Sequence, residues 1–278
     1  MEFDFTEEQL LIQKTARDFA KNELAPKAQE RDEKGTFPTE ELRELAELGL
    51  MGVNVPEAYG GTEAGVVAYS LAITELAKGC AATTVAVAVT NMVAEVICKF
   101  GTEAQKDKYV NAITEGEFEA GAFALSEPQA GRDAAALRTR AVRDGDSWVI
   151  NGTKQWITFG DHSGVAVVWA KTDPDAGVKG ISAFLVTPDM PGFSVGRHED
   201  KMGLRGSTTV SLNFEDCRVP ADALLGEVGE GFKIAMTALD GGRIGIAAQA
   251  WGVGMAALEE GSRYAIEREA FGGKLGAL

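Results

Sequence analysis

Two short segments of the sequence carry residue types that could hold a flat aromatic ligand. The first is residues 123–133, FALSEPQAGRD, and the second is residues 154–158, KQWIT. The first offers the hydroxyl of Ser126, and the second offers that of Thr158 close to the ring of Trp156. Hydroxyl and backbone donors beside an aromatic ring suit a ring system with polar edges, such as a flavin. Taken alone, the second segment is better explained as an ordinary strand with one core aromatic, and only its pairing with the first segment favours a flavin.

Two pairs of residues near the end of the chain could also contact a ligand. Asp240 and Arg243 are three residues apart, so in a helix they share a face. A solvated ion pair of this kind is common and weakly stabilising, whereas the small residues around Arg243 would let a ligand approach. Arg268 and Phe271 have a plain reading as the polar and apolar faces of a helix end.

The histidines and cysteines form no reactive pattern. His162 and His198 lack the spacing of a metal site or a catalytic triad, and we expect them on the surface or in loops. Cys80, Cys98 and Cys217 are isolated and odd in number, which indicates reduced thiols instead of a disulfide framework or a metal site.

The composition is typical of a globular protein of one large or two ordinary domains. The chain has 278 residues, of which 45% are hydrophobic and 25% are charged. Its net charge of −15 argues against nucleic acid and anionic membranes as partners, although a few local cations could hold an anionic ligand. The start of the chain has no signal-peptide pattern, and no apolar run is expected to approach the ~20 residues of a membrane span. We therefore expect a cytoplasmic protein without a membrane span.

The sequence pattern changes twice and divides the chain into three parts. Residues 1–117 read as a helical domain, in which Thr6 opens a capping box, Thr39 is expected to cap a later helix and Gly101 ends another. Residues 118–228 read as short strands, with a hairpin turn at Asp144-Gly145 and a second turn at Asn151-Gly152. Such strands predict a small antiparallel barrel or sandwich.

Residues 229–278 read as the start of a C-terminal helical bundle. Gly245, Gly252 and Gly254 lie inside a predicted helix, where glycine costs up to ~1 kcal/mol relative to alanine. Their presence therefore predicts close approach of a second helix. The expected fold class is α+β, with a helical domain, a β domain and part of a second helical domain.

The two ligand-holding segments and the order of the three parts resemble the acyl-CoA dehydrogenase family. The resemblance covers essentially all 278 residues, and residues 240–247 are most similar to short-chain, butyryl-CoA-type members. Each motif is weak alone, but all of them in this order are strong. The other motifs are GTEAQK at 101–106, KMGLRGS at 201–207, FEDCRVP at 214–220, LGE at 225–227 with GF at 231–232, LDGGR at 239–243 and REAFG at 268–272.

The resemblance implies FAD as the cofactor. The Thr158 hydroxyl would hydrogen-bond flavin N5, groups near Leu125 and Ser126 would hold the N1/O2 edge, and Trp156 would cover one ring face. The cofactor-binding residues it implies are Phe123, Leu125, Ser126, Trp156, Ile157, Thr158, Arg268 and Phe271.

The implied substrate is an acyl-CoA thioester, contacted by Arg132, Asp240 and Arg243. Arg132 stands where relatives usually carry a small serine, and residues 273–274 depart from the Lys-Pro pair that usually follows Phe-Gly. In the family the segment of Arg268 and Phe271 reaches the FAD of a neighbouring subunit, which implies a homo-oligomer, expected as a homotetramer built from two dimers. Electrons would pass to an electron-transferring flavoprotein, as in fatty acid β-oxidation.

The implied reaction is α,β-dehydrogenation, in which a carboxylate removes the α-proton while the β-hydrogen leaves as hydride to flavin N5. The family supplies that base beyond the position of Leu278 or at the position of Gly242, which has no side chain. Glu127 and Glu259 are available carboxylates, but nothing in the sequence places either at the α-carbon.

Two explanations of the missing base follow. The chain is a fragment of a longer enzyme, which its abrupt end favours, or it is a truncated, non-catalytic flavin- or acyl-CoA-binding or assembly protein. An acyl-CoA oxidase, which passes electrons to oxygen, is the alternative within the enzyme class.

Overall fold

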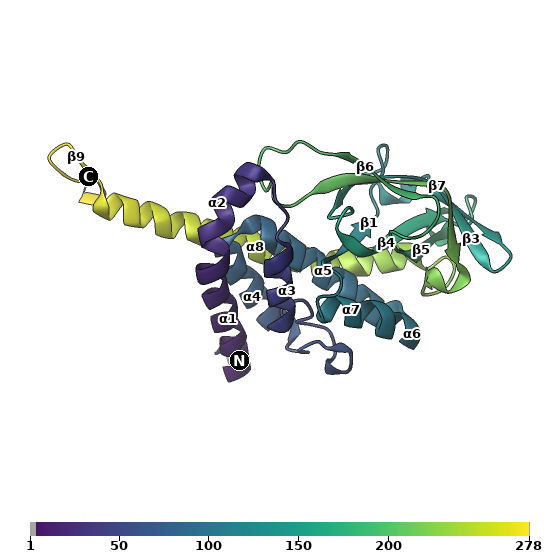
Figure 1. The fold of residues 1–278 in the computed structure, drawn as a ribbon, viewed down its shortest axis with the longest axis horizontal. Coiled ribbons are helices and arrows are strands. Elements are labelled where there is room, and N and C mark those ends of the chain that lie inside the picture. The colour runs from purple at the N-terminus through teal and green to yellow at the C-terminus, as the bar shows by residue number, and fades with distance from the viewer. Residues whose placement is uncertain (1–3, 278) are drawn as a thin grey trace.

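The computed structural model describes residues 4–277 and has helices in its first and last parts with a β-sheet between them (Figure 1). This order confirms the expected fold class. The first part contains α1 Glu7–Phe19, a π-helical turn Ala20–Leu24, α2 Ala25–Lys34, α3 Thr39–Glu47, α4 Gly65–Gly79, α5 Ala81–Phe100, α6 Glu103–Gln105, a second π-helical turn Lys106–Val110 and α7 Asn111–Thr114.

The helix starts and stops show which local signals determine structure. The capping box is confirmed, because the Thr6 hydroxyl accepts from the Gln9 amide at 3.2 Å and the Gln9 side chain accepts from the Thr6 amide at 3.1 Å. The predicted Thr39 cap is wrong. The Leu42 amide donates to the carbonyl of Pro38, so Pro38 is the N-cap residue. Helix α3 therefore begins with Thr39, one residue earlier than predicted.

Helix α5 corrects the expectation that no apolar run reaches membrane-span length. The helix has 20 residues, and an 18-residue window of it has a mean hydropathy of 1.7, so length and composition alone would permit a span. In the folded chain 72% of that window is buried inside the protein. Helix α5 is a core helix that packs on α4, on the sheet and on the last helix.

The middle part forms one eight-stranded sheet in the order β6-β7-β3-β2-β4-β5-β8, with β1 paired to β4. The hairpin at Asp144-Gly145 is confirmed, since Asp144 pairs with Ser147 across it. Most pairs are antiparallel as expected, whereas β1 with β4 and β2 with β4 are parallel. The strands are β1 Ala120–Ala124, β2 Arg140–Asp144, β3 Ser147–Thr158, β4 Ser163–Lys171, β5 Ile181–Val186, β6 Phe193–His198, β7 Thr209–Pro220 and β8 Leu224–Leu225.

The predicted turn at Asn151-Gly152 is wrong, because β3 continues through both residues. The Asn151 side chain accepts from the Asp216 amide at 2.8 Å and donates to the Asp216 carboxylate at 3.0 Å on β7. The register of β3 against β7 shifts at this point. A dipeptide typical of turns is therefore used for a bulge within a long strand.

The last part is dominated by one helix of 37 residues, α8 Gly231–Glu267, followed by a small hairpin of β9 Glu269–Ala270 and β10 Gly273–Lys274. Figure 1 shows α8 running from the sheet past α5 and α4, with its end projecting away from the body. The indole of Trp169 on β4 donates to the Gly231 carbonyl at 2.7 Å, which fixes the start of α8 on the sheet.

The three helix glycines behave differently. A methyl group on Gly245 would lie 2.4 Å from the Tyr69 hydroxyl, and one on Gly252 would lie 2.2 Å from the Thr74 carbonyl oxygen. Close helix approach is confirmed at both. The expectation is wrong for Gly254, where an added methyl group would meet no atom of another element within 4 Å.

Candidate functional site

A cleft of about 500 Å³ lies where the ends of β1 and β3 meet α5 and α8. It gathers most of the sequence-predicted site residues from three separate stretches of the chain. Helix α5 adds Val89 and Met92, and α8 adds Met236 and Leu239. The predicted residues that line the cleft are Phe123, Leu125, Ser126, Arg132, Trp156, Thr158 and Arg243.

The β3 end of the cleft has an unusual backbone. Trp156 and Phe159 have φ angles of 58° and 56°, a region that large side chains rarely occupy and that costs about 1–3 kcal/mol. The register with β7 also shifts between Lys154 and Ile157. As a result Trp156 is 57% exposed, while Ile157 and Phe159 are buried. Of the three cofactor residues predicted at 156–158, Ile157 points into the core and can offer a ligand only its backbone.

Two backbone and side-chain links join the segments. The Gln155 amide donates to the Ser126 carbonyl at 2.9 Å. The Lys154 ammonium donates to the Leu125 carbonyl at 3.2 Å and to the Glu127 carboxylate at 2.7 Å. Lys154 and Glu127 are 0% and 2% exposed. The sequence prediction missed this pair.

Glu127 is ionised and accepts hydrogen bonds through its carboxylate. Burial would raise its pKa, but the Lys154 charge and hydrogen bonds from Lys154, Thr139 and Arg138 outweigh burial and lower the pKa to about 2. Burial lowers the pKa of Lys154 to about 8, against the opposing effect of Glu127. Glu127 is therefore unsuited to take a proton from a ligand. Glu259, the other carboxylate considered, is 59% exposed beside Lys78 and does not line the cleft.

The α8 side of the cleft carries charge and apolar space together. Arg243 and Asp240 form an ion pair at 2.6 Å with 70% and 76% of their side chains exposed, so the pair contributes little stability. Arg243 lines the cleft, whereas Asp240 does not. An adjoining apolar cavity of about 540 Å³ shares part of the same wall. Its lining is Ala88, Val89, Met92, Leu239, Gly242, Arg243, Ile246, Ala247 and Ala250.

The structure does not bring Arg268 and Phe271 to this cleft. Both follow the end of α8, and Figure 1 shows that end on the opposite side of the molecule from the eight-stranded sheet. Phe271 is 92% exposed and has a φ of 55°.

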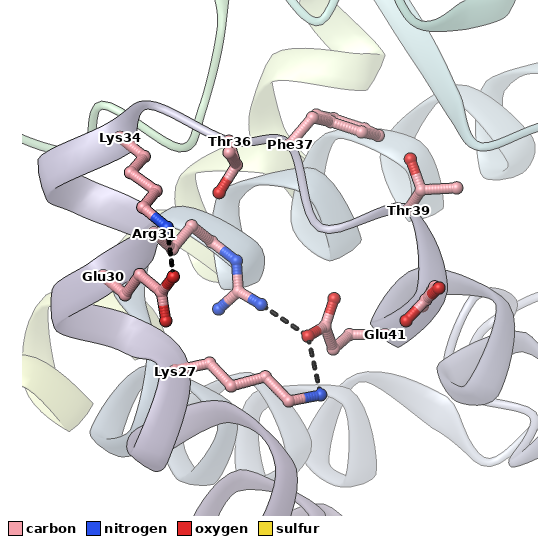
Figure 2. Close-up of a pocket in the computed structure, with 9 residues that line it drawn as sticks. Lys27, Glu30, Arg31, Lys34, Thr36, Phe37, Thr39 and Glu41 are labelled. Carbon is pink, nitrogen blue, oxygen red and sulfur yellow. Dashed lines mark hydrogen bonds and ion pairs between the residues drawn. The ribbon is translucent and has the colours of Figure 1, made fainter.

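A second pocket, of about 410 Å³, lies between α2 and α3 (Figure 2). There Glu41 accepts from Arg31 at 2.6 Å and from Lys27 at 3.1 Å. Burial would raise the Glu41 pKa, but a backbone hydrogen bond and these two cations outweigh it and lower the pKa. The charged groups at the centre of this pocket satisfy one another, which indicates a structural role.

His162 lies in the turn between β3 and β4, as expected for a loop histidine, and it has close partners there. Its ring stacks on Phe37 at 3.8 Å, and its Nδ1 lies 3.2 Å from Glu119. His198 is 62% exposed, with Nε2 3.7 Å from Asp161. Within residues 4–277 no three His, Cys, Asp or Glu side chains are arranged to hold a metal ion. The three cysteines are free thiols.

Comparisons with known proteins agree with this architecture. Sequence profiles of the acyl-CoA dehydrogenase N-terminal, middle and C-terminal domains match residues 6–117, 122–217 and 229–278. The mitochondrial short-chain specific acyl-CoA dehydrogenase of Rattus norvegicus is 48% identical over 269 residues, which are 96% of this chain. The chain spans 65% of the length of that relative.

Two solved structures share nearly the whole fold. Butyryl-CoA dehydrogenase from Megasphaera elsdenii superposes with a TM-score of 0.95 at 44% identity, covering 99% of this chain and 73% of its own. A chain in a structure from work on the electron transferring flavoprotein of Acidaminococcus fermentans superposes with a TM-score of 0.98 at 46% identity, covering 100% and 73%. The profiles, the relatives and the three-part fold agree, and the chain belongs to the acyl-CoA dehydrogenase family.

Proposed function

We propose that this chain provides the flavin- and substrate-binding part of a short-chain acyl-CoA dehydrogenase. The proposed reaction is the FAD-dependent conversion of an acyl-CoA thioester to a trans-2-enoyl-CoA. The observation that carries the proposal is the cleft in which Ser126, Trp156 and Thr158 meet Arg243 of α8. The relatives named for short-chain and butyryl-CoA dehydrogenase support the same reaction.

The chemistry of the cleft fits a flavin ring. Trp156 is 57% exposed and has a strained backbone angle, and its indole offers a flat apolar surface. The hydroxyls of Ser126 and Thr158 add donors at the polar edges of such a ring. FAD, when bound, supplies the acceptor for a hydride. The cofactor residues proposed are Phe123, Leu125, Ser126, Trp156, Ile157 through its backbone, and Thr158, with Arg268 and Phe271 serving a neighbouring subunit.

The adjoining apolar cavity suits a short acyl chain, and the cations at the rim suit the coenzyme A portion. Arg132 and Arg243 line the cleft, and a guanidinium group can pair with anionic or carbonyl oxygens. Asp240, paired with Arg243, would orient that guanidinium. Gly242 offers no base because it has no side chain, and Glu127 is a weak base because Lys154 helps to lower its pKa to about 2.

The remaining features of the proposal come from the family and its relatives. They are domains at residues 1–117, 118–228 and 229–278, a cytoplasmic homotetramer, a role in fatty acid β-oxidation, and an electron-transferring flavoprotein as electron acceptor. The structural relative from work on such a flavoprotein supports the last of these.

A visible spectrum of the purified protein, recorded before and after anaerobic addition of butyryl-CoA, tests the proposal. A yellow protein whose flavin band bleaches supports dehydrogenation. One that stays yellow favours the alternative of a non-catalytic flavin- or acyl-CoA-binding protein, and a colourless protein that takes up no added FAD rejects the cofactor. Reoxidation by air instead of an electron-transferring flavoprotein would identify an oxidase.

A pair of variants on β3 sharpens the test. Thr158→Val removes the hydroxyl that lines the cleft, and we expect slower bleaching. Thr153→Val removes a hydroxyl that bonds Asn213 at 3.2 Å elsewhere on the same strand, and it should leave bleaching unchanged. Equal effects of the two variants would count against the assignment of Thr158.

A further inference from the structure

We propose that the buried Lys154–Glu127 pair is a clasp that positions the two cleft segments relative to each other, so that Ser126 and Thr158 present their hydroxyls in a fixed arrangement. Both residues are positioning residues, since neither lines the cleft. The inference rests on the proposed flavin site and adds to it the device that holds it in shape.

The geometry of Lys154 ties β3 to the end of β1. Its ammonium reaches the carbonyl of Leu125 at 3.2 Å, one residue before Ser126. The next residue of β3, Gln155, donates its amide to the Ser126 carbonyl at 2.9 Å. Two successive residues of one segment therefore hold two successive carbonyls of the other, immediately beside the cleft-lining side chains.

Glu127 extends the clasp to the start of β2. Its carboxylate accepts from the amides of Arg138 and Thr139 at 2.6 and 3.0 Å and from the Gln129 side chain at 2.6 Å, as well as from Lys154. These four bonds satisfy a carboxylate that is 2% exposed. Glu127 also closes a tight backbone turn with Ala130, which leads into the segment of Arg132. Glu127 therefore also supports, through its backbone, the segment that carries Arg132 to the cleft.

A positioning role explains why this ion pair is buried better than a stabilising role does. Replacing a buried ion pair by apolar residues of similar volume is often neutral or stabilising, so such a pair is weak evidence for stability. What the apolar alternative cannot supply is a donor for the Leu125 carbonyl. The pair therefore acts through the geometry of the segments that it joins.

The clasp also predicts a pH dependence. Glu127 is the charged group facing Lys154, and burial leaves the Lys154 pKa at about 8. As the pH rises through this value the ammonium loses its proton and its charge-assisted bond to Glu127. FAD affinity should then decline between pH 7 and 9, a decline that a variant without Lys154 would lack.

The experiment compares the wild-type chain with Lys154→Met, the double variant Glu127→Gln/Lys154→Met, and Arg218→Met as matched control. Arg218 forms an exposed ion pair with Asp144 at 2.7 Å in the same sheet. FAD dissociation constants are measured from pH 7 to 9, and amide hydrogen exchange is measured by mass spectrometry at residues 123–127 and 154–158. We expect at least about tenfold weaker FAD binding at pH 7 and faster exchange in both segments for the two clasp variants, with neither change in Arg218→Met.

The outcomes separate the clasp from the flavin assignment. FAD binding within twofold of wild type in the clasp variants overturns the inference, even if exchange rises. If the wild-type chain takes up no FAD, the proposed function fails and exchange alone decides, with unchanged exchange rejecting the clasp and faster exchange supporting it. If Lys154→Met does not fold, the double variant gives the answer, because it carries no unpaired buried charge.

Discussion

The packing of α8 on α4 gives a sharp prediction from two glycines of one helix. Gly252 faces α4, where an added methyl group would lie 2.2 Å from the Thr74 carbonyl oxygen and 2.8 Å from the Ala77 Cβ. Favourable contacts between heavy atoms lie near 3.5–4.0 Å, so Gly252→Ala must push the two helices apart by roughly an ångström. The same substitution at Gly254 meets nothing within 4 Å.

The two substitutions should change the free energy of unfolding in opposite directions. Overpacking costs about 1–3 kcal/mol, and replacing glycine by alanine in a helix gains up to about 1 kcal/mol. Gly254→Ala should therefore stabilise the chain by up to about 1 kcal/mol. Gly252→Ala should destabilise it by up to about 2 kcal/mol, because a backbone oxygen cannot move aside as a side chain can.

Urea unfolding of both variants beside the wild type measures this difference. With a slope of about 2–3 kcal/mol per molar urea, the two midpoints should lie roughly 0.5–1 M apart, on either side of the wild-type value. Equal midpoints for the two variants would refute the close contact of α8 with α4. The contact matters for the site because α8 carries Arg243 and Leu239 to the cleft.

Further predictions concern the buried pair, the missing base and the thiols. Glu127→Gln alone should cost about 3–5 kcal/mol because it strands the Lys154 charge, whereas Glu127→Gln/Lys154→Met should unfold in urea near the wild-type midpoint. The pKa of Glu127 is lowered to about 2 in the folded chain. Ionised Glu127 therefore stabilises the fold above the pKa that it has in the unfolded chain, and this stabilisation is lost as the pH falls toward 2. Acid titration should therefore unfold the wild type at a higher pH than the double variant. Gly242→Glu should speed flavin bleaching by butyryl-CoA, since its Cβ would displace only the flexible Met92 sulfur 2.7 Å away and its carboxylate would enter the apolar cavity. A wild-type bleaching rate would contradict this. Burial raises the pKa of Cys98 and Cys217 to about 11, so iodoacetamide at pH 8 should label both slowly in the folded chain and rapidly in urea.

The features that sequence predicted well depend on residues that are neighbours in the chain. The capping box of Thr6 needs only Gln9, and the hairpin after Asp144 needs only its own turn. The Asn151-Gly152 turn failed because the Asn151 side chain finds Asp216, which is 65 residues away. A local rule cannot include a partner that only the fold brings close.

At the cleft, too, the sequence did not predict what depends on distant partners. The motifs predicted which segments would meet, and seven of the predicted residues line one cavity. They did not predict that Ile157 would turn inward, because its orientation follows from a register shift between β3 and β7. The distant pair Arg268 and Phe271 has no place at this cleft within one chain.

The missed clasp did leave a signal in the sequence. Trp148, Ile150, Gly152 and Lys154 alternate along β3, which places Lys154 on the buried face with the two apolar residues. A lysine at such a position requires a carboxylate partner, and Glu127 lies in the segment already suspected of holding the ligand. A buried lysine and two non-glycine residues at positive φ break local rules within six consecutive residues of one strand end. Such departures concentrate where a chain is shaped for a ligand and not for stability alone. The strained end of β3 is therefore stronger evidence for a binding site than its hydroxyls are, since hydroxyls occur on many strands and this strain must be offset by contacts made elsewhere.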